Sequence, residues 1–206
     1  MELPGWFPDD VSRETLERLD AFADLAARWS AKINLVSKRD LPFIRDRHIW
    51  DSLQICTKEH LSYGPTWLDL GSGGGFPGLV VAIMAKEMAP GLKVTLVESD
   101  QRKGAFLRTA VQTFHLNAAV DVKRIEALRV LPPATISARA LADLPKLLSL
   151  SSEFTEANTK FLLPKGESWK EEIELARKHW HFDVTAEASH TNNKAAILEL
   201  RHVRRI

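Results

Sequence analysis

Four glycines lie within five residues directly after a short apolar run, and this stretch limits the possible folds more than any other. The apolar run is 66–70, the glycines fall within 71–75, and a second apolar run follows Pro77. This order predicts a buried strand, a tight turn and a helix. Glycine allows positive φ and close approach of a bound molecule, and Pro77 suits a first helical position because its missing N–H needs no partner there. The stretch therefore predicts a ligand-binding turn.

Segments with strand and helix patterns alternate after this turn, which is typical of a parallel sheet with helices on both faces. The last forty residues instead suggest two strands joined by a hairpin or a longer loop. We therefore expect an α/β, Rossmann-like fold whose mostly parallel sheet has an antiparallel C-terminal edge. The expected strands are Thr66–Leu70, Lys93–Glu98, Val120–Lys123, Thr135–Ala138, Thr159–Leu163, Phe182–Ala188 and Ala195–His202, and the expected helices are Pro77–Met88, Gln101–His115, Asp143–Leu150 and Ser168–Trp180.

The region before the sheet has a helical pattern. Apolar residues spaced three and four apart predict an amphipathic packing helix over Val11–Ser30, and a second helical stretch runs roughly over Leu41–Thr57. Within it, Arg47, His48 and Asp51 can share a face. Three roles stay open for these side chains. They form a solvated, salt-bridged face, they contact RNA, or they hold the N-terminal helices over the site. We expect residues 1–62 to be a helical extension packed on a single compact domain of residues 63–206.

Charge and cysteine content exclude several classes of protein. The 28 basic and 27 acidic residues leave a net charge of +1, so any contact with nucleic acid must come from local basic patches. The lone Cys56 excludes a disulfide framework and a cysteine-rich zinc site. We expect no metal site, no membrane span, a cytoplasmic location and a monomer.

Two classes of ligand compete for the glycine turn. A phosphate-binding P-loop is excluded because no Gly-Lys-Ser/Thr follows the glycines. The pattern Gly73-x-Gly75-x-x-Gly78 does match the dinucleotide fingerprint, and Glu98 lies 20 residues beyond Gly78, where a ribose-binding acid belongs. Asp69 argues against this alternative, because its charge directly before the turn would repel a pyrophosphate and attract a cation. Phe76-Pro77 also places bulk and a missing N–H where phosphate would bind.

S-adenosylmethionine (SAM) fits this turn better than a dinucleotide. Its ammonium and sulfonium suit Asp69 and the glycine carbonyls, its carboxylate suits turn N–H groups such as that of Gly73, and its ribose diol suits Glu98. The run from Asp69 to Gly75 has the form of the first motif of Rossmann-like methyltransferases. The third strand ends before Glu126, where such enzymes usually hold the adenine.

Several stretches between residues 33 and 166 together resemble one family, RsmG (GidB), bacterial methyltransferases of small-subunit ribosomal RNA. The sequence departs from the family pattern at Ser137-Ala-Arg139, which has an extra residue between Ser and Arg, and at Glu98, where Asp was expected. The matching stretches are Ile33-Asn-Leu-Val-Ser37, Arg47-His-Ile-Trp-Asp-Ser-Leu53, Leu68-Asp-Leu-Gly-Ser-Gly-Gly-Gly-Phe-Pro-Gly78, Val97-Glu-Ser99, Arg102-Lys103, Phe106-Leu107, Arg124-Ile-Glu126, Ser137-Ala-Arg139-Ala140 and Leu163-Pro-Lys-Gly166.

The resemblance implies SAM-dependent methylation of guanine N7 at position 527 of 16S ribosomal RNA, free or within the small ribosomal subunit. It also implies that the cofactor pocket is lined by Gly71, Phe76, Ile125, Glu126 and Arg139. Attack by N7 needs no general base, so we expect Arg139 and Lys165 to act by positioning and electrostatics. The expected RNA contacts are Arg47, His48, Arg124 and Lys165. An NAD(P)-dependent oxidoreductase, a noncatalytic RNA-binding or assembly module and a methyltransferase of other substrates remain open alternatives.

Overall fold

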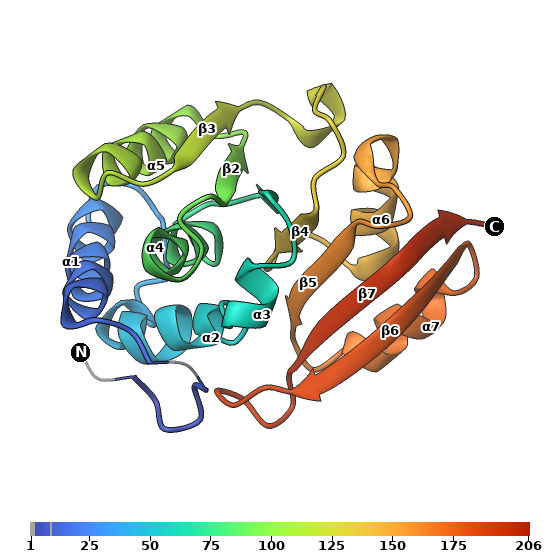
Figure 1. The fold of residues 1–206 in the computed structure, drawn as a ribbon, viewed down its shortest axis with the longest axis horizontal. Coiled ribbons are helices and arrows are strands. Elements are labelled where there is room, and N and C mark those ends of the chain that lie inside the picture. Colours follow the sequence, from blue (N-terminus) through green and yellow to red (C-terminus); the bar gives the residue numbers. More distant parts are fainter. Residues whose placement is uncertain (1–2, 9) are drawn as a thin grey trace.

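The computed structural model describes residues 3–8 and 10–206 and contains one seven-stranded sheet (Figure 1). The strand order is β3-β2-β1-β4-β5-β7-β6. The first five strands are parallel, whereas β7 runs antiparallel to both β5 and β6. This confirms the α/β fold with an antiparallel C-terminal edge. The strands are β1 Thr66–Leu70, β2 Lys93–Glu98, β3 Ala118–Val122, β4 Thr135–Ala138, β5 Lys160–Lys165, β6 Trp180–Ala188 and β7 Ala196–Arg205.

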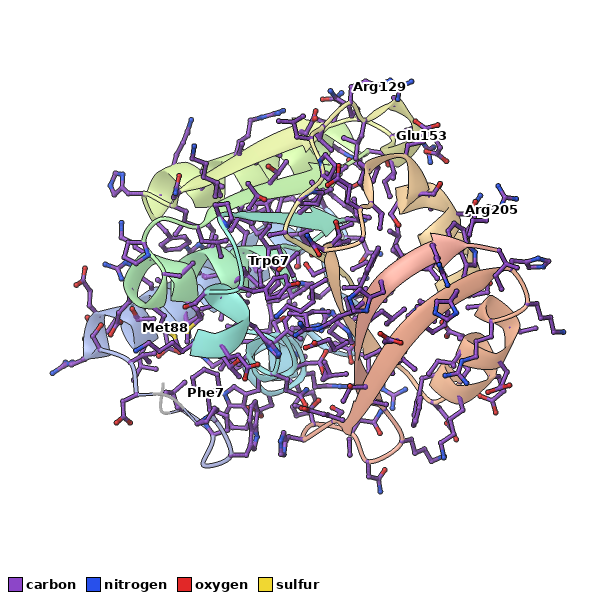
Figure 2. All side chains as sticks on the ribbon, turned by 45° about the vertical axis from the view of Figure 1, so that its right-hand side comes forward. Phe7, Trp67, Met88, Arg129, Glu153 and Arg205 are labelled. Atoms are coloured by element: carbon purple, nitrogen blue, oxygen red, sulfur yellow. The ribbon has the colours of Figure 1, made fainter. Side chains whose placement is uncertain are left out.

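Helices cover both faces of the sheet, and a hydrophobic core lies on each face. The side chains of β1 contribute to both cores. Its Trp67 belongs to the hydrophobic core beneath α1, α4 and α5, whereas Leu68 and Leu70 belong to a second core beneath α6 and α7. Successive side chains of a strand point to opposite faces, so a continuous apolar strand supplies both cores. Figure 2 shows Trp67 deep among the side chains. The helices are α1 Arg13–Ser30, α4 Gly78–Met88, α5 Gln101–Thr113, α6 Leu144–Ser151 and α7 Trp169–Ala176.

The first helix is built and anchored as its sequence suggests. Ser12 caps α1 by accepting a hydrogen bond from the backbone N–H of Thr15. Both hydroxyls then donate to Glu87 at the end of α4, at 2.7 and 2.6 Å. The ring of Phe22 lies 5.1 Å from that of Phe76 beside the glycine turn. Residues on both sides of position 62 thus share one core, and the division at 62 stays a prediction.

The second expected helix, Leu41–Thr57, is wrong as a single element. The segment consists of the 3₁₀ turn η1 Leu41–Phe43, the π-helical turn η2 Arg45–Ile49 and the short helix α2 Trp50–Leu53, and α3 Lys58–Leu61 follows. Side chains compete for the backbone here, because the Ser52 hydroxyl donates to the His48 carbonyl at 2.6 Å. A π turn carries an extra residue, which changes the directions of the side chains on either side of it.

None of the described helices is long and apolar enough to cross a membrane. Pro77, expected inside the helix, precedes α4 and follows a cis peptide bond with Phe76.

Candidate active site

The glycine turn connects β1 to α4 and lies at the carboxyl end of the parallel strands. Gly71 and Gly73 have φ values of +67° and +53°, which side chains rarely adopt. A Cβ on Gly71 would also lie 2.7 Å from Leu141. The Ser72 N–H donates to the Val97 carbonyl at 2.9 Å and fixes the turn against β2. The turn is therefore held open by backbone conformations that need glycine.

A cavity of about 300 Å³ opens beside this turn. Five of the eight residues expected to bind the cofactor line it, and they come from the ends of β1, β2 and β3. Ser99 and Lys103, from the start of the α5 segment, and Leu141 and Leu150, from around α6, complete the wall. The expected residues in the cavity are Gly71, Gly73, Glu98, Ile125 and Glu126, and Arg124 lines it too.

Glu98 ends β2 at the floor of this cavity and is buried. One carboxylate oxygen accepts the Gly73 N–H at 2.9 Å, and the other accepts the Asp100 N–H at 2.8 Å. Each oxygen keeps acceptor capacity, because an ionised carboxylate offers about four lone-pair sites. Glu98 can therefore brace the turn and still accept hydroxyl groups from a ligand.

Asp69 lies behind the turn and does not line the cavity. Its carboxylate is fully buried, accepts the Ser137 hydroxyl at 2.6 Å, and lies so close to the start of α4 that a Cβ on Gly78 would be 2.5 Å away. Burial raises the pKa of Asp69 to about 6, although the hydrogen bonds that its carboxylate accepts act to lower that pKa. An acid beneath the α4 N-terminus takes the place where a pyrophosphate would bind, which disfavours the dinucleotide alternative.

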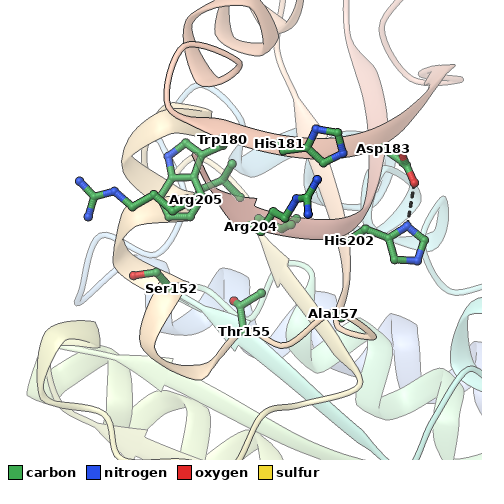
Figure 3. A pocket seen from close by; sticks show the side chains of 11 residues that line it. Ser152, Thr155, Ala157, Trp180, His181, Asp183, His202, Arg204 and Arg205 are labelled. Carbon is green, nitrogen blue, oxygen red and sulfur yellow. Dashed lines mark hydrogen bonds and ion pairs between the residues drawn. The ribbon is translucent and has the colours of Figure 1, made fainter.

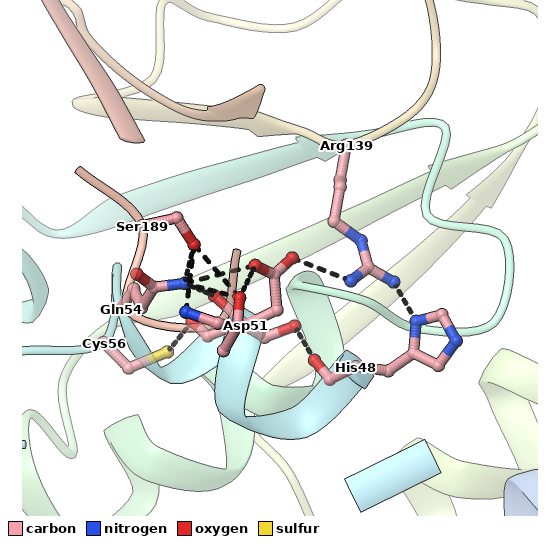
Figure 4. A network of polar contacts seen from close by, with 8 residues as sticks. His48, Asp51, Gln54, Cys56, Arg139 and Ser189 are labelled. Atoms are coloured by element: carbon pink, nitrogen blue, oxygen red, sulfur yellow. Dashed lines mark hydrogen bonds and ion pairs between the residues drawn. The ribbon is translucent and has the colours of Figure 1, made fainter. Parts of the chain in front are cut away.

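Arg139 follows β4 and is held by the N-terminal segment (Figure 4). Its guanidinium donates to the Asp51 carboxylate at 3.0 Å and lies 2.7 Å from Nδ1 of His48. Burial, and then the charge of Arg139, lower the pKa of His48 to about 4, so the ring is neutral and Nδ1 accepts the bond. Asp51 and His48 therefore pin Arg139 instead of forming a solvated face.

Phe76 packs away from the cavity beside the turn. Its ring lies 5.1 Å from that of His48, and the Arg139 guanidinium carbon is 5.4 Å from its centroid. The aromatic ring is 5% exposed and belongs to the core under α1 and α4. The structure thus places Phe76 and Arg139 together, and neither of them lines the cavity that contains Glu98.

A second cavity of about 690 Å³ lies next to the first. Ala140, which has a φ of +52°, lines both cavities. The second one is bounded by Arg47, Asp51 and Arg139 on one side, by the end of β5, and by the loop 189–195 between β6 and β7. Two cavities that share a wall suit a cofactor and a substrate that must react with each other.

Lys165 ends β5 and borders the second cavity with little exposure. Its ammonium donates to the Ala142 carbonyl at 2.9 Å and to Glu172 at 2.8 Å. Glu172 also accepts the Leu144 N–H at the start of α6 at 2.9 Å. Two of the three donors of Lys165 therefore tie β5 to the loop before α6 and to α7, which leaves one N–H for a ligand.

The remaining expected contacts lie at the rims. Arg47 is half exposed, pairs with Asp40, and borders the second cavity. Arg124 is exposed at the first cavity. Leu141, which covers Gly71, was missed because nothing in its sequence context marks it. Within residues 3–8 and 10–206, no group of three or more His, Cys, Asp or Glu side chains is arranged to hold a metal ion.

Comparison with solved structures identifies the fold. An O-methyltransferase from Bacillus cereus in complex with SAH superposes with a TM-score of 0.60 at 14% identity, covering 96% of this chain and 93% of that chain. A SAM dependent methyltransferase from Aquifex aeolicus gives a TM-score of 0.60 at 14% identity and covers 80% of this chain and 95% of that chain. The fold is therefore that of the Rossmann-like SAM-dependent methyltransferases, as expected from the sequence.

Sequence comparison identifies the family. Proteins named ribosomal RNA small subunit methyltransferase G are similar over almost the whole chain. The one from Ruegeria sp. (strain TM1040) is 44% identical over 96% of this chain and 95% of its own length. That from Paracoccus denitrificans (strain Pd 1222) is 46% identical over 94% and 98%. The sequence model of the same family, described as "rRNA small subunit methyltransferase G", matches residues 15–202. The chain therefore belongs to the GidB family of rRNA small subunit methyltransferases.

Proposed function

We propose that this protein transfers the methyl group of SAM to N7 of a guanine in 16S ribosomal RNA, at position 527 if it follows the family resemblance. Membership of the family supports the coarser part, a SAM-dependent methyltransferase of small-subunit rRNA. The observation that carries the proposal is the pair of cavities that meet at Ala140 at the carboxyl ends of the parallel strands. In α/β sheets, ligands bind at this edge.

The first cavity has the donor set that SAM requires. The left-handed backbone at Gly71 and Gly73 presents turn N–H and carbonyl groups to the methionine part of the ligand. The Glu98 carboxylate suits the ribose diol, and Ile125 offers an apolar wall to the adenine. Asp69 is separated from the cavity by the turn, so its contribution to binding a cationic ligand is electrostatic and indirect.

When bound, SAM supplies an electrophilic methyl group on a sulfonium. The guanine N7 has a free in-plane lone pair, so this chain needs to supply no general base. Its residues hold the base in line and near enough for attack, and exclude water from the path. Asp51 and His48 fix the direction of Arg139 at the edge of the second cavity, and the free N–H of Lys165 can donate to O6 of the base or to a phosphate.

Both cations act by positioning. A cation directly against the purine would disfavour the positively charged product. The Asp51 carboxylate, 3.0 Å from the Arg139 guanidinium, partly neutralises that charge. Glu172 screens Lys165 in the same way at 2.8 Å. Arg47 and Arg124 stand at the rims of the two cavities, where they suit the phosphates that flank the reacting nucleotide.

The substrate includes 16S rRNA or the small ribosomal subunit, and the protein acts as a cytoplasmic monomer. The test uses SAM labelled in its methyl group, small subunits lacking this modification, and the same rRNA without protein. Chemical cleavage at N7-methylguanine then maps the label on the RNA. We expect label at a single guanine, and Arg139→Ala should lower the rate at least tenfold.

The outcomes separate the alternatives. Label on an exocyclic nitrogen or on protein would contradict the mechanism. RNA binding without any transfer would instead support the noncatalytic assembly module. Lys32→Ala, an exposed change just after α1, serves as the control for Arg139→Ala and should leave the rate unchanged.

A further inference from the structure

A third cavity lies at the opposite end of the sheet from the active site. It has a volume of about 620 Å³ and is formed by the ends of β6 and β7 and by the segment that connects α6 to β5. Because β7 runs antiparallel to β5, its last residues reach beyond the amino end of β5. The two cavities of the active site lie at the carboxyl ends, so this cavity is a separate site.

The wall of this cavity that β6 and β7 form carries the cationic residues, and its floor is apolar. Arg204, Arg205 and His181 are exposed on the strand side, and Figure 3 shows Ser152 and Thr155 facing them across the opening. Leu148, Trp180 and Val203 lie at the base of the cavity. The register pairs Trp180 with Arg205 and His181 with Arg204, so both arginines lie opposite the first residues of β6.

Positive charge is concentrated here although the whole chain is almost neutral. Segments 177–181 and 201–205 contain five arginines and lysines, three histidines and no acid, in a chain whose net charge is only +1. Arg201 pairs with Glu199, and the one carboxylate of the cavity, Asp183, is engaged by His202 at 2.7 Å. Among the described ion pairs, none uses Arg204 or Arg205. Two guanidinium groups without an acidic partner leave this edge positively charged, which favours the binding of an anion such as phosphate.

A β-bulge contributes to this arrangement. The register of β6 and β7 shifts between His181 and Asp183, and His202 opposite the shift has a φ of +53°. Bulges redirect side chains at the edges of sheets. Here the imidazole of His202 lies 2.7 Å from the Asp183 carboxylate.

We infer that this cavity and the cationic segments around it form a second docking surface, which binds the phosphodiester backbone of the rRNA substrate. The inference rests on the proposed function, because it takes the partner to be that RNA. Bidentate guanidinium groups match phosphate geometry, and Arg204 and Arg205 both line the cavity. A surface at this edge would hold the RNA at a distance from the reacting guanine and leave the active site free to engage that base.

The test measures RNA binding directly, without a methyl donor, by filter binding at several salt concentrations. The variant is Arg204→Gln with Arg205→Gln, and the control is Arg28→Gln in the last turn of α1 with Lys32→Gln just after that helix, which removes the same charge from another exposed surface. Each lost phosphate contact lowers the slope of log K against log salt by about 0.7–0.9. The pair should therefore reduce the slope by about 1.5 and weaken binding about tenfold near 0.15 M salt.

Three results would overturn the inference: an unchanged slope, an equal effect of the control pair, or weaker binding to whole subunits with unchanged binding to bare RNA. The last would point to a ribosomal protein as the partner. Equal melting temperatures of the variants exclude a folding defect. Binding is measured without methyl transfer. A reduced slope in the variant, together with no methylation by the wild type, would therefore contradict the proposed function alone.

Discussion

At the scale of single residues, the neutral state of His48 is the property on which the position of Arg139 depends. A protonated imidazole has no acceptor nitrogen, so it could not receive the bond from the guanidinium. Burial is the largest cause of the pKa of about 4, and Arg139 itself adds to it. Asp51 and Asp40 act in the opposite direction.

The pH dependence of stability follows from this shift. In the unfolded chain the His48 pKa is near 6.5, and in the folded protein it is about 4, so the unfolded state takes up a proton first as the pH falls. Stability from His48 is therefore present above pH 6.5 and is lost progressively toward pH 4. Against His48→Gln, which accepts the same bond and does not titrate, the wild type should lose about 1–2 kcal/mol, an amount discounted for the partial exposure of the ring.

Denaturant unfolding of both proteins between pH 4 and 7 checks this prediction. Asp69, whose pKa is raised, changes stability in the opposite direction over an overlapping range, but it is present in both proteins and cancels in the difference. A difference in unfolding free energy that is constant with pH would contradict a neutral His48 in the folded state.

At the scale of elements, the segment 45–54 forms hydrogen bonds to two walls of the second cavity, Arg139 after β4 and the β6–β7 loop. Its Asp51 holds Arg139 after β4 and also accepts the Thr191 hydroxyl from the β6–β7 loop at 2.9 Å. Gln54 accepts the His190 N–H at 2.8 Å and donates to the Ser189 hydroxyl at 3.1 Å. The Trp6 ring stacks on His190 at 4.6 Å from the opposite side. The loop is thereby fixed as a wall of the substrate cavity.

Gln54→Ala should loosen this wall without disturbing the cofactor cavity. We expect the KM for small-subunit RNA to rise about tenfold through the loss of the hydrogen bonds from Gln54 to this loop, of about 0.5–1.5 kcal/mol each, with SAM affinity unchanged. Steady-state methylation and calorimetry measure the two quantities. Gln112→Ala on the exposed face of α5 is the matched control. An equal loss of SAM affinity would mean that Gln54 supports the whole fold and not this wall.

The same segment shows where prediction from sequence reaches its limit. The strand Thr66–Leu70 and the turn after it are specified by local composition, and the structure places β1 at those residues. The Leu41–Thr57 helix failed because Asp51 and Gln54 are held by partners 88 and 136 residues away, which periodicity cannot detect. Glu98 could be placed at the end of β2 from the sequence, because its spacing from the turn follows from the strand–helix–strand unit.

At the scale of the whole molecule, the topology gathers chemistry from segments far apart in the sequence. The carboxyl ends of β1, β2 and β3 form the first cavity, and those of β4 and β5 form the second together with the β6–β7 loop. The N-terminal segment fixes this edge from outside (Figure 1). Arg139 and Lys165 could be placed at this edge from the sequence, but their ion-pair partners could not, since those lie on other elements.

The central claim is that the first cavity binds SAM through the glycine turn and Glu98, and calorimetry tests it most directly. We expect the wild type to bind one SAM per chain and to show no binding of NAD. Glu98→Ala should weaken SAM at least tenfold, because hydrogen bonds to a charged group contribute about 1.5–3 kcal/mol. The exposed Glu174→Ala should leave the affinity unchanged. Binding of NAD at this site, or SAM affinity that does not depend on Glu98, would contradict the account.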